Sequence, residues 1–350
     1  MTGQYAKDQP SSSSNRIEKV AIVGAGGSIG KHIASHLLKT GKHTITALAR
    51  PDSTGQLPDG LHIIKIDYTS DDDTALVTAL RGQQALIITM SVSAPPNTTL
   101  NLIRAAAKAN VPYILPNWYG HDPANNSLCN DTFLSDRRDS ITSEIARLGV
   151  SAYILLACNF WYGFSLGGGP DRYGFDFKNR SLILFDAGNV PINTSTWPQC
   201  GRAIANLLSL KEVPEDENDT SPTLSQFRNG SVYISSFRVS QRDMFESVKR
   251  VTGTRDADWS VTCESAEQRR RDGRDAVQGG DMRGFIKLMY SRMFFGNGDG
   301  DYESARGLHN KLLGLPVEDL DEFTAVAVRL GEEGEVVSYG HGAADNITSW

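Results

Sequence analysis

The stretch at residues 20–30, Val-Ala-Ile-Val-Gly-Ala-Gly-Gly-Ser-Ile-Gly, constrains the fold of this 350-residue chain more than any other. Its four apolar residues predict a short buried strand, and the glycine cluster that follows predicts a tight turn. Apolar residues then recur at helical spacing from Ile29 to Leu38, which predicts a helix directly after the turn. A strand, a glycine turn and a helix in this order indicate a dinucleotide-binding unit, because the amide groups at the helix start face the phosphates.

The glycine spacing is Gly24-x-x-Gly27-x-x-Gly30, with an additional Gly26, rather than the commoner G-x-G-x-x-G. In this interpretation Gly24 permits the turn, Gly27 lets the backbone approach a pyrophosphate, and Gly30 lets the helix pack close to the strand. A lone glycine cluster is also typical of an ordinary turn, but the flanking strand and helix favour a cofactor site. The cofactor contacts expected in this turn are Gly24, Gly26, Gly27, Ser28, Ile29 and Gly30.

Strands and helices continue to alternate up to about residue 160. Short apolar segments separated by helical patterns predict a parallel sheet covered on both faces, which is a Rossmann-type doubly wound α/β fold. Ligands of such a sheet bind at the carboxyl ends of its strands. The expected strands after the first are 43–49, 61–66, 85–90, 111–115 and 151–156, and the expected helices are 72–80, 100–109 and 133–148.

Arg50 follows the second expected strand at the position where an NAD-specific fold usually carries an acidic residue. An arginine there accommodates the 2′-phosphate of NADP, so the sequence predicts NADP(H) as the cofactor. The alternative is a solvated arginine at a strand end. Asp67, Met90 and Ser91 follow the next strands and are expected to contact the cofactor as well.

The regular pattern fades after residue 160. We expect a disordered polar tail at 1–16, an NADP-binding Rossmann domain at 17–160, and a region at 161–350 that is mainly a smaller α/β substrate-binding cap. Some segments of that last region are expected to return to the Rossmann domain. The acidic stretch 212–222 is expected to be an exposed loop. Residues 297–301, Asn-Gly-Asp-Gly-Asp, hint at a calcium loop, but Tyr302 replaces the required glycine, so we expect a turn.

Charge and cysteine usage exclude several classes of function. Lys and Arg number 35 against 41 Asp and Glu, and the net charge of −6 does not support binding to nucleic acid or membranes. The four cysteines and seven histidines are scattered without metal-ligand spacing, which predicts reduced thiols and no metal site. With no signal peptide or membrane span in the pattern, we expect a cytoplasmic monomer or weak homodimer that takes a small-molecule substrate.

Together these motifs resemble the NmrA-like and isoflavone-reductase-like group of atypical short-chain dehydrogenases, in particular its fungal members. The resemblance covers about residues 19–330 and is carried by the segments 23–30, 48–51, 111–117, 201–204 and 232–237. It implies an NADP-binding Rossmann domain with a substrate cap, and reduction of small, often aromatic, secondary metabolites. In some members it implies redox sensing without catalysis. It also implies nicotinamide-side contacts at Pro116, Asn117, Asn159 and Phe160.

The chain departs from the catalytic patterns of this group. No tyrosine is followed four positions later by lysine, so the Tyr-Lys pair of ordinary short-chain dehydrogenases is missing. The lysine of the reductase subgroup is matched here by Arg138, or by Arg137 after a slip of one residue. An arginine orients groups and stabilises charge rather than acting as a base. Tyr119 and His121 are candidate proton donors, and the alternatives are a packed aromatic and a surface histidine.

Aromatic residues near these segments are expected to form an apolar substrate pocket, although core packing is the alternative for each. The expected substrate-binding residues are Trp118, Trp161, Tyr162, Tyr173 and Phe175. The sequence thus predicts an NADPH-dependent reductase of an aromatic or alkaloid-like intermediate in secondary metabolism. The reactions considered are reduction of an imine, iminium or unsaturated bond, alone or coupled to a later cyclisation. The competing hypothesis is a regulator that senses NADP(H) without catalysis.

Overall fold

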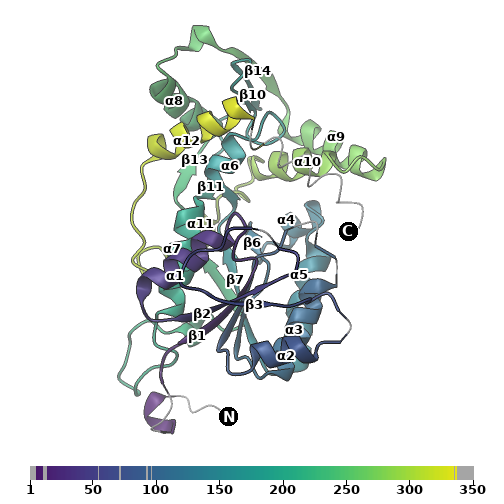
Figure 1. Cartoon of the computed structure of the whole chain (residues 1–350). Coiled ribbons are helices and arrows are strands. Elements are labelled where there is room, and N and C mark those ends of the chain that lie inside the picture. Colours follow the sequence, from purple (N-terminus) through teal and green to yellow (C-terminus); the bar gives the residue numbers. More distant parts are fainter. Residues whose placement is uncertain are drawn as a thin grey trace.

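The structure is a computed structural model that describes residues 5–10, 14–53, 55–70, 72–91, 94–95, 97–334 and 336. An eight-stranded sheet with helices on both faces forms the lower part of Figure 1, and a smaller α/β unit, the cap, lies above it. The two parts meet at one end of the sheet, where short segments such as β6 and α4 lie between them.

The large sheet is parallel throughout, with the strand order β12-β7-β5-β4-β1-β2-β3 and with β6 paired to β7. Its central strands are almost entirely apolar because both faces of the sheet are covered. The strands are β1 (Lys19–Val23), β2 (Thr44–Ala49), β3 (His62–Lys65), β4 (Ala85–Ile88), β5 (Tyr113–Leu115), β6 (Tyr119–Gly120), β7 (Ala152–Ala157) and β12 (Gly230–Tyr233).

Helices cover both faces of this sheet. Residues Val20 and Ile22 of β1 pack into the core formed with α1 (Gly30–Thr40) and α7 (Trp197–Leu208). The alternate residues of the same strand, Ala21 and Val23, pack against the helices of the opposite face. Those helices are α2 (Thr74–Leu80), α3 (Thr98–Lys108) and α5 (Ser135–Leu148). The Rossmann-type doubly wound fold expected from the sequence is therefore confirmed.

The cap consists of two three-stranded sheets and the helices packed on them. One sheet has the order β14-β10-β9 and the other β13-β11-β8. The strands are β8 (Phe160–Trp161), β9 (Phe175–Asp176), β10 (Ser181–Phe185), β11 (Ile192–Ser195), β13 (Phe237–Val239) and β14 (Ser260–Glu264). The helices are α6 (Tyr162–Leu166), α8 (Gln241–Thr252), α9 (Ala266–Gln278), α10 (Gly284–Met293), α11 (Tyr302–Arg306) and α12 (Leu320–Glu333).

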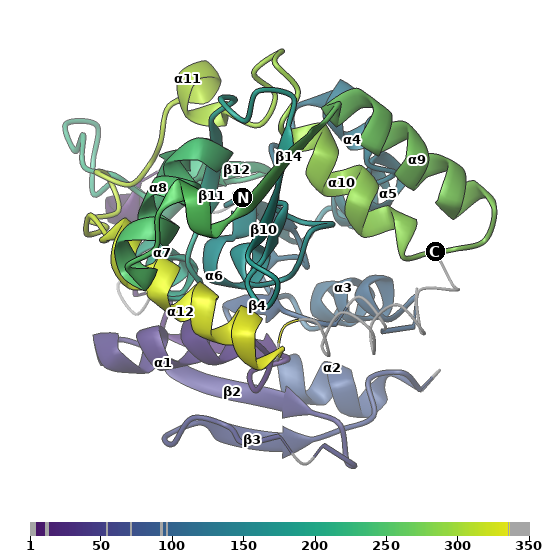
Figure 2. The same ribbon diagram turned by 90° about the horizontal axis from the view of Figure 1, so that it is seen from above.

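The chain passes repeatedly between the two parts. Helix α7 and strand β12 belong to the Rossmann layer, although cap strands precede and follow them in the sequence. A short helix, α4 (Asn126–Asp131), rises from the Rossmann side and contacts α10 of the cap. In the view from above, the α9–α10 hairpin lies beside α4 and α5 at one side of the molecule (Figure 2). The remaining short elements are three 3₁₀ turns, η1 (Ala6–Asp8), η2 (Leu224–Phe227) and η3 (Asp256–Asp258).

The expected disordered tail needs a correction where the structure describes it. Residues 5–10 include the η1 turn, and the Ala6 amide donates to the carbonyl of Pro214 at 2.8 Å. Asn15 donates through Nδ2 to the carbonyl of Val213 at 2.9 Å. The tail thus docks on the acidic 212–222 loop, in which Asp219 accepts hydrogen bonds from the amides of Glu215 and Ser221 and pairs with Lys211. Residues 1–4 and 11–13 lie outside the described residues.

The turn at 297–301 is a turn in the structure too. Asp299 is bound by Arg292, and the side chain of Asp301 caps α11 by accepting from the Ser304 amide. Among the described residues, no group of three or more His, Cys, Asp or Glu side chains is arranged to hold a metal ion. Within the same part of the chain, no helix combines the length and hydropathy needed to cross a membrane.

Candidate functional site

Two glycines of the N-terminal motif are required by sterics. Gly24 has a φ of +83°, which side-chain-bearing residues rarely adopt, and a Cβ there would lie 2.1 Å from the carbonyl oxygen of Thr89. A Cβ on Gly30 would lie 2.0 Å from the carbonyl oxygen of Gly24. The turn and the close approach of α1 to the sheet therefore both depend on glycine, as the sequence predicts.

The rest of the motif forms a cradle of backbone groups at the start of α1. A Cβ on Gly26 or Gly27 would have its nearest neighbour at 3.2 Å, so these positions are tight but not closed. The amides of Ser28 and Ile29 carry no hydrogen bond to any described residue. Unpaired amides and the positive end of a helix dipole attract phosphate groups. The cradle therefore fits the pyrophosphate of a dinucleotide.

Arg50 lies at the carboxyl end of β2 with 58% of its side chain exposed. Among the described residues, the carboxylate that pairs with it is that of Asp52, at 3.7 Å from Nε. Lys65 at the end of β3 donates through Nζ to the carbonyl of Ser53 at 2.8 Å, and this contact fastens the loop that carries Arg50. The guanidinium is weakly paired and accessible, as binding of a 2′-phosphate requires.

The other expected cofactor residues also lie at strand ends. Asp67 accepts from the amide of Thr69 at 2.9 Å and from its hydroxyl at 2.6 Å, and these hydrogen bonds lower the pKa of the Asp67 carboxyl. Asn117 donates through Nδ2 to the carbonyl of Met90 at 3.0 Å and ties the ends of β4 and β5 together. Pro116 is buried and Ser91 is exposed. Their contacts with a cofactor stay predictions.

Asn159 follows β7 with a φ of +51° and is buried. Its Nδ2 donates to the carbonyl of Asn193 at 2.8 Å, but its Oδ1 has no hydrogen-bond partner among the described residues. Phe160 comes next and stacks on Tyr290 with a centroid distance of 3.8 Å. A strained backbone and an unpaired buried acceptor are typical of functional positions. The expectation for Asn159 stays a prediction.

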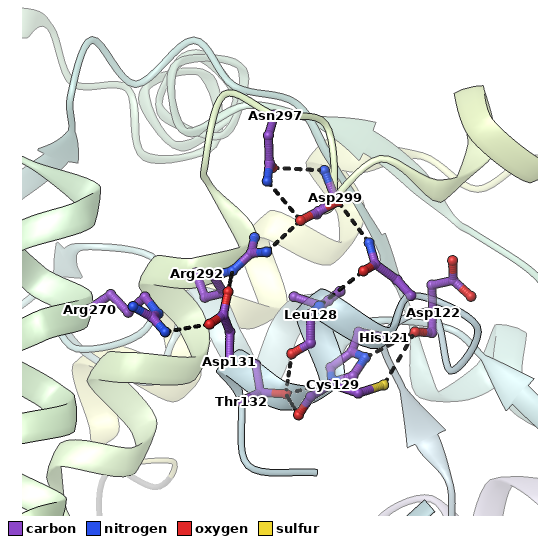
Figure 3. Close-up of polar contacts among 11 residues, drawn as sticks. His121, Asp122, Leu128, Cys129, Asp131, Thr132, Arg270, Arg292, Asn297 and Asp299 are labelled. Atoms are coloured by element: carbon purple, nitrogen blue, oxygen red, sulfur yellow. Dashed lines mark hydrogen bonds and ion pairs between the residues drawn. The ribbon is translucent and has the colours of Figure 1, made fainter. Parts of the chain in front are cut away.

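Both expected proton donors have their polar atoms buried. The hydroxyl of Tyr119 is buried in the core without a partner among the described residues, and burial beside Cys158 and Cys200 raises its pKa well above 10. His121 is also buried, and its Nε2 lies 3.0 Å from the hydroxyl of Thr132 (Figure 3). Burial lowers the pKa of His121 to about 4, so the ring is neutral at pH 7. The alternative of a surface histidine is therefore wrong, and the catalytic role expected of each residue stays a prediction.

Arg138 lies on α5, and its side chain fixes the backbone before α4. It donates through Nε to Asp139 at 2.7 Å and through Nη1 to the carbonyl of Pro123 at 2.8 Å and to Asn126 at 2.9 Å. The hydrogen bond with Asp139 raises the pKa of the guanidinium. These contacts differ from both the expected catalytic role and the solvated alternative. The neighbouring Arg137 is partly exposed, and desolvation lowers its pKa.

Most of the expected substrate-binding aromatics are core residues. Tyr162, Tyr173 and Phe175 are fully buried in the cap, and the hydroxyl of Tyr162 lies 2.7 Å from that of Thr324. Trp118 is buried and donates through Nε1 to the carbonyl of His121 at 3.2 Å. For these four residues the packing alternative holds. Trp161 differs because its ring is partly exposed.

Trp161 belongs to a group of aromatic rings that sequence reasoning missed. Its ring centroid lies 6.1 Å from that of Phe164 and 5.9 Å from that of Trp197, and the last two are 5.8 Å apart. Trp197 also stacks on His32 at 6.2 Å. We call Trp161, Phe164 and Trp197 the tryptophan cluster. Trp197 opens α7, far along the chain, so no spacing rule links it to Trp161.

A polar network joins the Rossmann side to the cap (Figure 3). Arg292 on α10 donates through Nε to Asp131 at 2.7 Å and through Nη2 to Asp299. Asp131, at the end of α4, also binds Arg270 of α9. Arg292 is almost completely buried, so this network fixes the position of the α9–α10 hairpin on α4.

Comparisons with known proteins agree with this geometry. Residues 24–124 match the family of NAD(P)H-binding domains. Oxidoreductase aprR of Aspergillus flavus is 27% identical over 315 residues, covering 88% of this chain and 97% of that protein. Oxidoreductase poxI of Penicillium oxalicum is 25% identical over 323 residues, covering 89% of this chain and 94% of that protein.

Solved structures share the fold. The structure of isoflavone reductase gives a TM-score of 0.67 with 20% identity, covering 89% of this chain and 99% of that one. An NADPH-dependent quinone oxidoreductase of Escherichia coli complexed with NADPH gives 0.61 with 20% identity, covering 87% and 98%. At these identities the structures establish the fold alone. The domain match confirms an NAD(P)H-binding domain, and with the two fungal relatives it supports the class of NAD(P)H-dependent oxidoreductase, while the preference for NADP(H) stays a prediction.

Proposed function

We propose that this chain is an NADP-dependent oxidoreductase of isoflavone-reductase-like fold that reduces a small aromatic or alkaloid-like intermediate of fungal secondary metabolism. Both fungal relatives are oxidoreductases, and they align with nearly their whole length. The observation that carries the proposal is the position of the tryptophan cluster. Trp197 stacks on His32, which is only two residues past Gly30 of the cofactor motif. Partly exposed aromatic rings thus lie next to the helix that receives the cofactor.

The residues of the chain divide the work as follows in this proposal. The cradle at 24–30 and Arg50 bind the phosphates of the cofactor, which supplies the hydride when bound. Asn117 holds the ends of β4 and β5 in register, and the tryptophan cluster stacks on the substrate and excludes water. Positioning rather than covalent chemistry is the contribution of this protein.

The burial of both candidate acids, Tyr119 and His121, narrows the reaction in this proposal. The Tyr119 hydroxyl points into the core, and His121 is neutral and hydrogen-bonded within the Rossmann side. Addition of a hydride to an imine or iminium needs no strong acid from the protein, since the cationic form accepts the hydride directly. We therefore favour an imine or iminium substrate over a ketone. A later cyclisation of the reduced product would take place in the same pocket.

The test follows NADPH oxidation by absorbance with a cyclic iminium, a matched ketone and an enone as candidate substrates. We expect turnover with the iminium, and a loss of at least about tenfold in kcat/KM in Trp161→Leu with NADPH affinity unchanged. The control is Phe133→Leu, because Phe133 is an exposed aromatic residue outside the tryptophan cluster. Turnover unaffected by Trp161→Leu would contradict the proposed pocket. NADPH binding without any turnover, but with affinities that differ between NADPH and NADP⁺, would favour the redox-sensing regulator instead.

A further inference from the structure

Arg172 is a buried cation without a carboxylate partner. Only 3% of the residue is exposed, and its guanidinium stacks 3.9 Å over the ring of Phe164. Nη1 donates to the carbonyl of Phe164 at 2.7 Å. Within the described part of the chain, no Asp or Glu forms an ion pair with this arginine. Desolvation lowers its pKa, as expected for a cation that no anion compensates.

The other buried arginines of the described residues are compensated. Arg269 pairs with Glu264, and Arg292 pairs with Asp131 and Asp299. A buried charge is costly unless a counter-ion and hydrogen bonds replace its hydration. The fold supplies carboxylates to two buried arginines, whereas no described carboxylate pairs with Arg172, so an anion from outside the chain would compensate its charge.

The two tryptophans that contact Phe164 carry hydrogen-bond donors without partners among the described residues. Phe164, over which the guanidinium lies, contacts both Trp161 and Trp197. The Nε1 atoms of both tryptophans are buried, and neither has a hydrogen-bond partner among the described residues. An indole N–H can only donate. The tryptophan cluster and Arg172 therefore present cationic and neutral donors, but no acidic side chain.

The cluster adjoins two segments of the expected cofactor site. Trp161 is two residues past Asn159, in the segment that follows the carboxyl end of β7. Trp197 contacts His32 in the first turn of α1, and burial lowers the pKa of His32 to about 4, so its ring adds no positive charge at pH 7. Arg172 is thus a charged group in contact with one ring of this cluster, that of Phe164.

We propose that Arg172 binds an anionic oxygen of the substrate, a carboxylate or a phenolate, while the tryptophan cluster stacks on the aromatic ring that carries it. This inference rests on the proposed function for the location of the substrate and narrows its class to acidic aromatic compounds. Arg172 is then a specificity-determining residue, because an uncharged analogue leaves the guanidinium buried and unpaired. The competing explanation is a structural arginine that only holds the Phe164 carbonyl.

The test uses two probes of equal shape, 4-methoxycinnamate and 4-methoxycinnamamide, titrated by calorimetry into the protein saturated with NADPH. We expect the native protein to bind the carboxylate at least about tenfold more tightly than the amide. Arg172→Gln should bind both probes alike, and Arg172→Lys should keep part of the preference. Arg242→Gln is the matched control, because Arg242 also donates to a backbone carbonyl, that of Ala187, but is exposed. It should keep the full preference.

Two results would overturn the inference: no preference for the carboxylate in the native protein, or an undiminished preference in Arg172→Gln. If Arg172→Gln does not fold, Arg172→Lys decides, since a purely structural role predicts a native-like preference for that folded variant. The cofactor is titrated separately. NADPH binding without probe discrimination contradicts the role of Arg172 alone, whereas failure to bind NADPH contradicts the proposed function and leaves the probe comparison measurable without cofactor.

Discussion

Replacing Arg292 by methionine should reveal how strongly the network of Figure 3 fixes the cap on the Rossmann side. The side chain is almost completely buried, lies 4.9 Å from the ring centroid of Phe295, and binds both Asp131 and Asp299. Methionine has a similar length and no charge, so Arg292→Met removes the cation while keeping much of the packing volume. Two partly buried carboxylates then lose their shared counter-ion.

The expected loss of unfolding free energy depends on the partners that the two carboxylates keep in the variant. Removing one partner of a buried ion pair costs about 3–5 kcal/mol of unfolding free energy. Asp131 keeps Arg270, and Asp299 keeps hydrogen bonds from Asn125 and Asn297, so the loss should lie near the lower limit, about 3 kcal/mol. The hydrogen bond with Arg292 also contributes to lowering the pKa of Asp299. In the variant, that carboxyl should take up a proton at higher pH.

Urea unfolding at pH 7 measures the effect. Arg283→Met is the control, because its pair with Asp281 is on the surface, with 71% of the arginine side chain exposed, and should contribute less than about 1 kcal/mol. Adding Asp299→Asn to Arg292→Met should recover part of the loss by removing an unpaired charge. A loss no larger than that of the control, or no recovery in the double variant, would refute the reasoning.

Three further predictions test individual residues. Since burial lowers the pKa of His121 from 6.5 to about 4, its neutral form stabilises the fold above pH 6.5, and about 3 kcal/mol should be lost as the pH falls from 6.5 to 4. Urea unfolding over this pH range should show a shallower dependence in His121→Gln, and an unchanged dependence would disprove the assignment. Gly30→Ala should abolish NADPH binding, because the added Cβ would lie 2.0 Å from the carbonyl oxygen of Gly24. Gly26→Ala should still bind NADPH measurably, because its Cβ would lie 3.2 Å from the nearest atom. If calorimetry shows tighter NADPH binding by Gly30→Ala than by Gly26→Ala, the steric argument is contradicted. Arg138→Ala should lower the unfolding free energy by about 1–3 kcal/mol, because it removes hydrogen bonds to Pro123, Asn126 and Asp139, whereas a catalytic role would instead reduce kcat at native stability.

The fold can be predicted from the sequence because each central strand is a short apolar run that is recognisable on its own. The apolar run at 20–23 and the glycines after it specify a strand buried on both faces and a turn that only glycine can make. Helical spacing after Gly30 then determines which face of α1 is buried. These patterns lie within short segments, so they can be recognised without any knowledge of tertiary contacts.

The direction in which side chains point after the strand ends cannot be predicted from the sequence. Tyr119 follows β5 at the right edge of the sheet, but the two-residue strand β6 pairs with β7 and its hydroxyl ends up in the core. His121 is similarly enclosed by the packing of α4, a helix too short to give a periodic pattern. The sequence predicts the correct side of the sheet for these residues, but not that tertiary packing buries their polar atoms there.

Long-range pairs account for the remaining differences. Arg292 and Asp131 are 161 positions apart, and no pattern in either helix indicates the other. Arg172 lies just after a glycine-rich break that reads as a loop, so its burial is visible only in three dimensions. The tryptophan cluster likewise assembles from α7 and the segment after β7.

The central claim is that the glycine cradle and Arg50 form an NADP(H) site, and calorimetric titration with NADPH and NADH tests it most directly. A charge-assisted hydrogen bond from Arg50 to the 2′-phosphate predicts at least about tenfold tighter binding of NADPH than of NADH by the native protein. In Arg50→Ala the affinity for NADPH should fall to that for NADH, which itself should hardly change. Equal affinities in the native protein, or a preference for NADPH that persists in Arg50→Ala, would contradict the account.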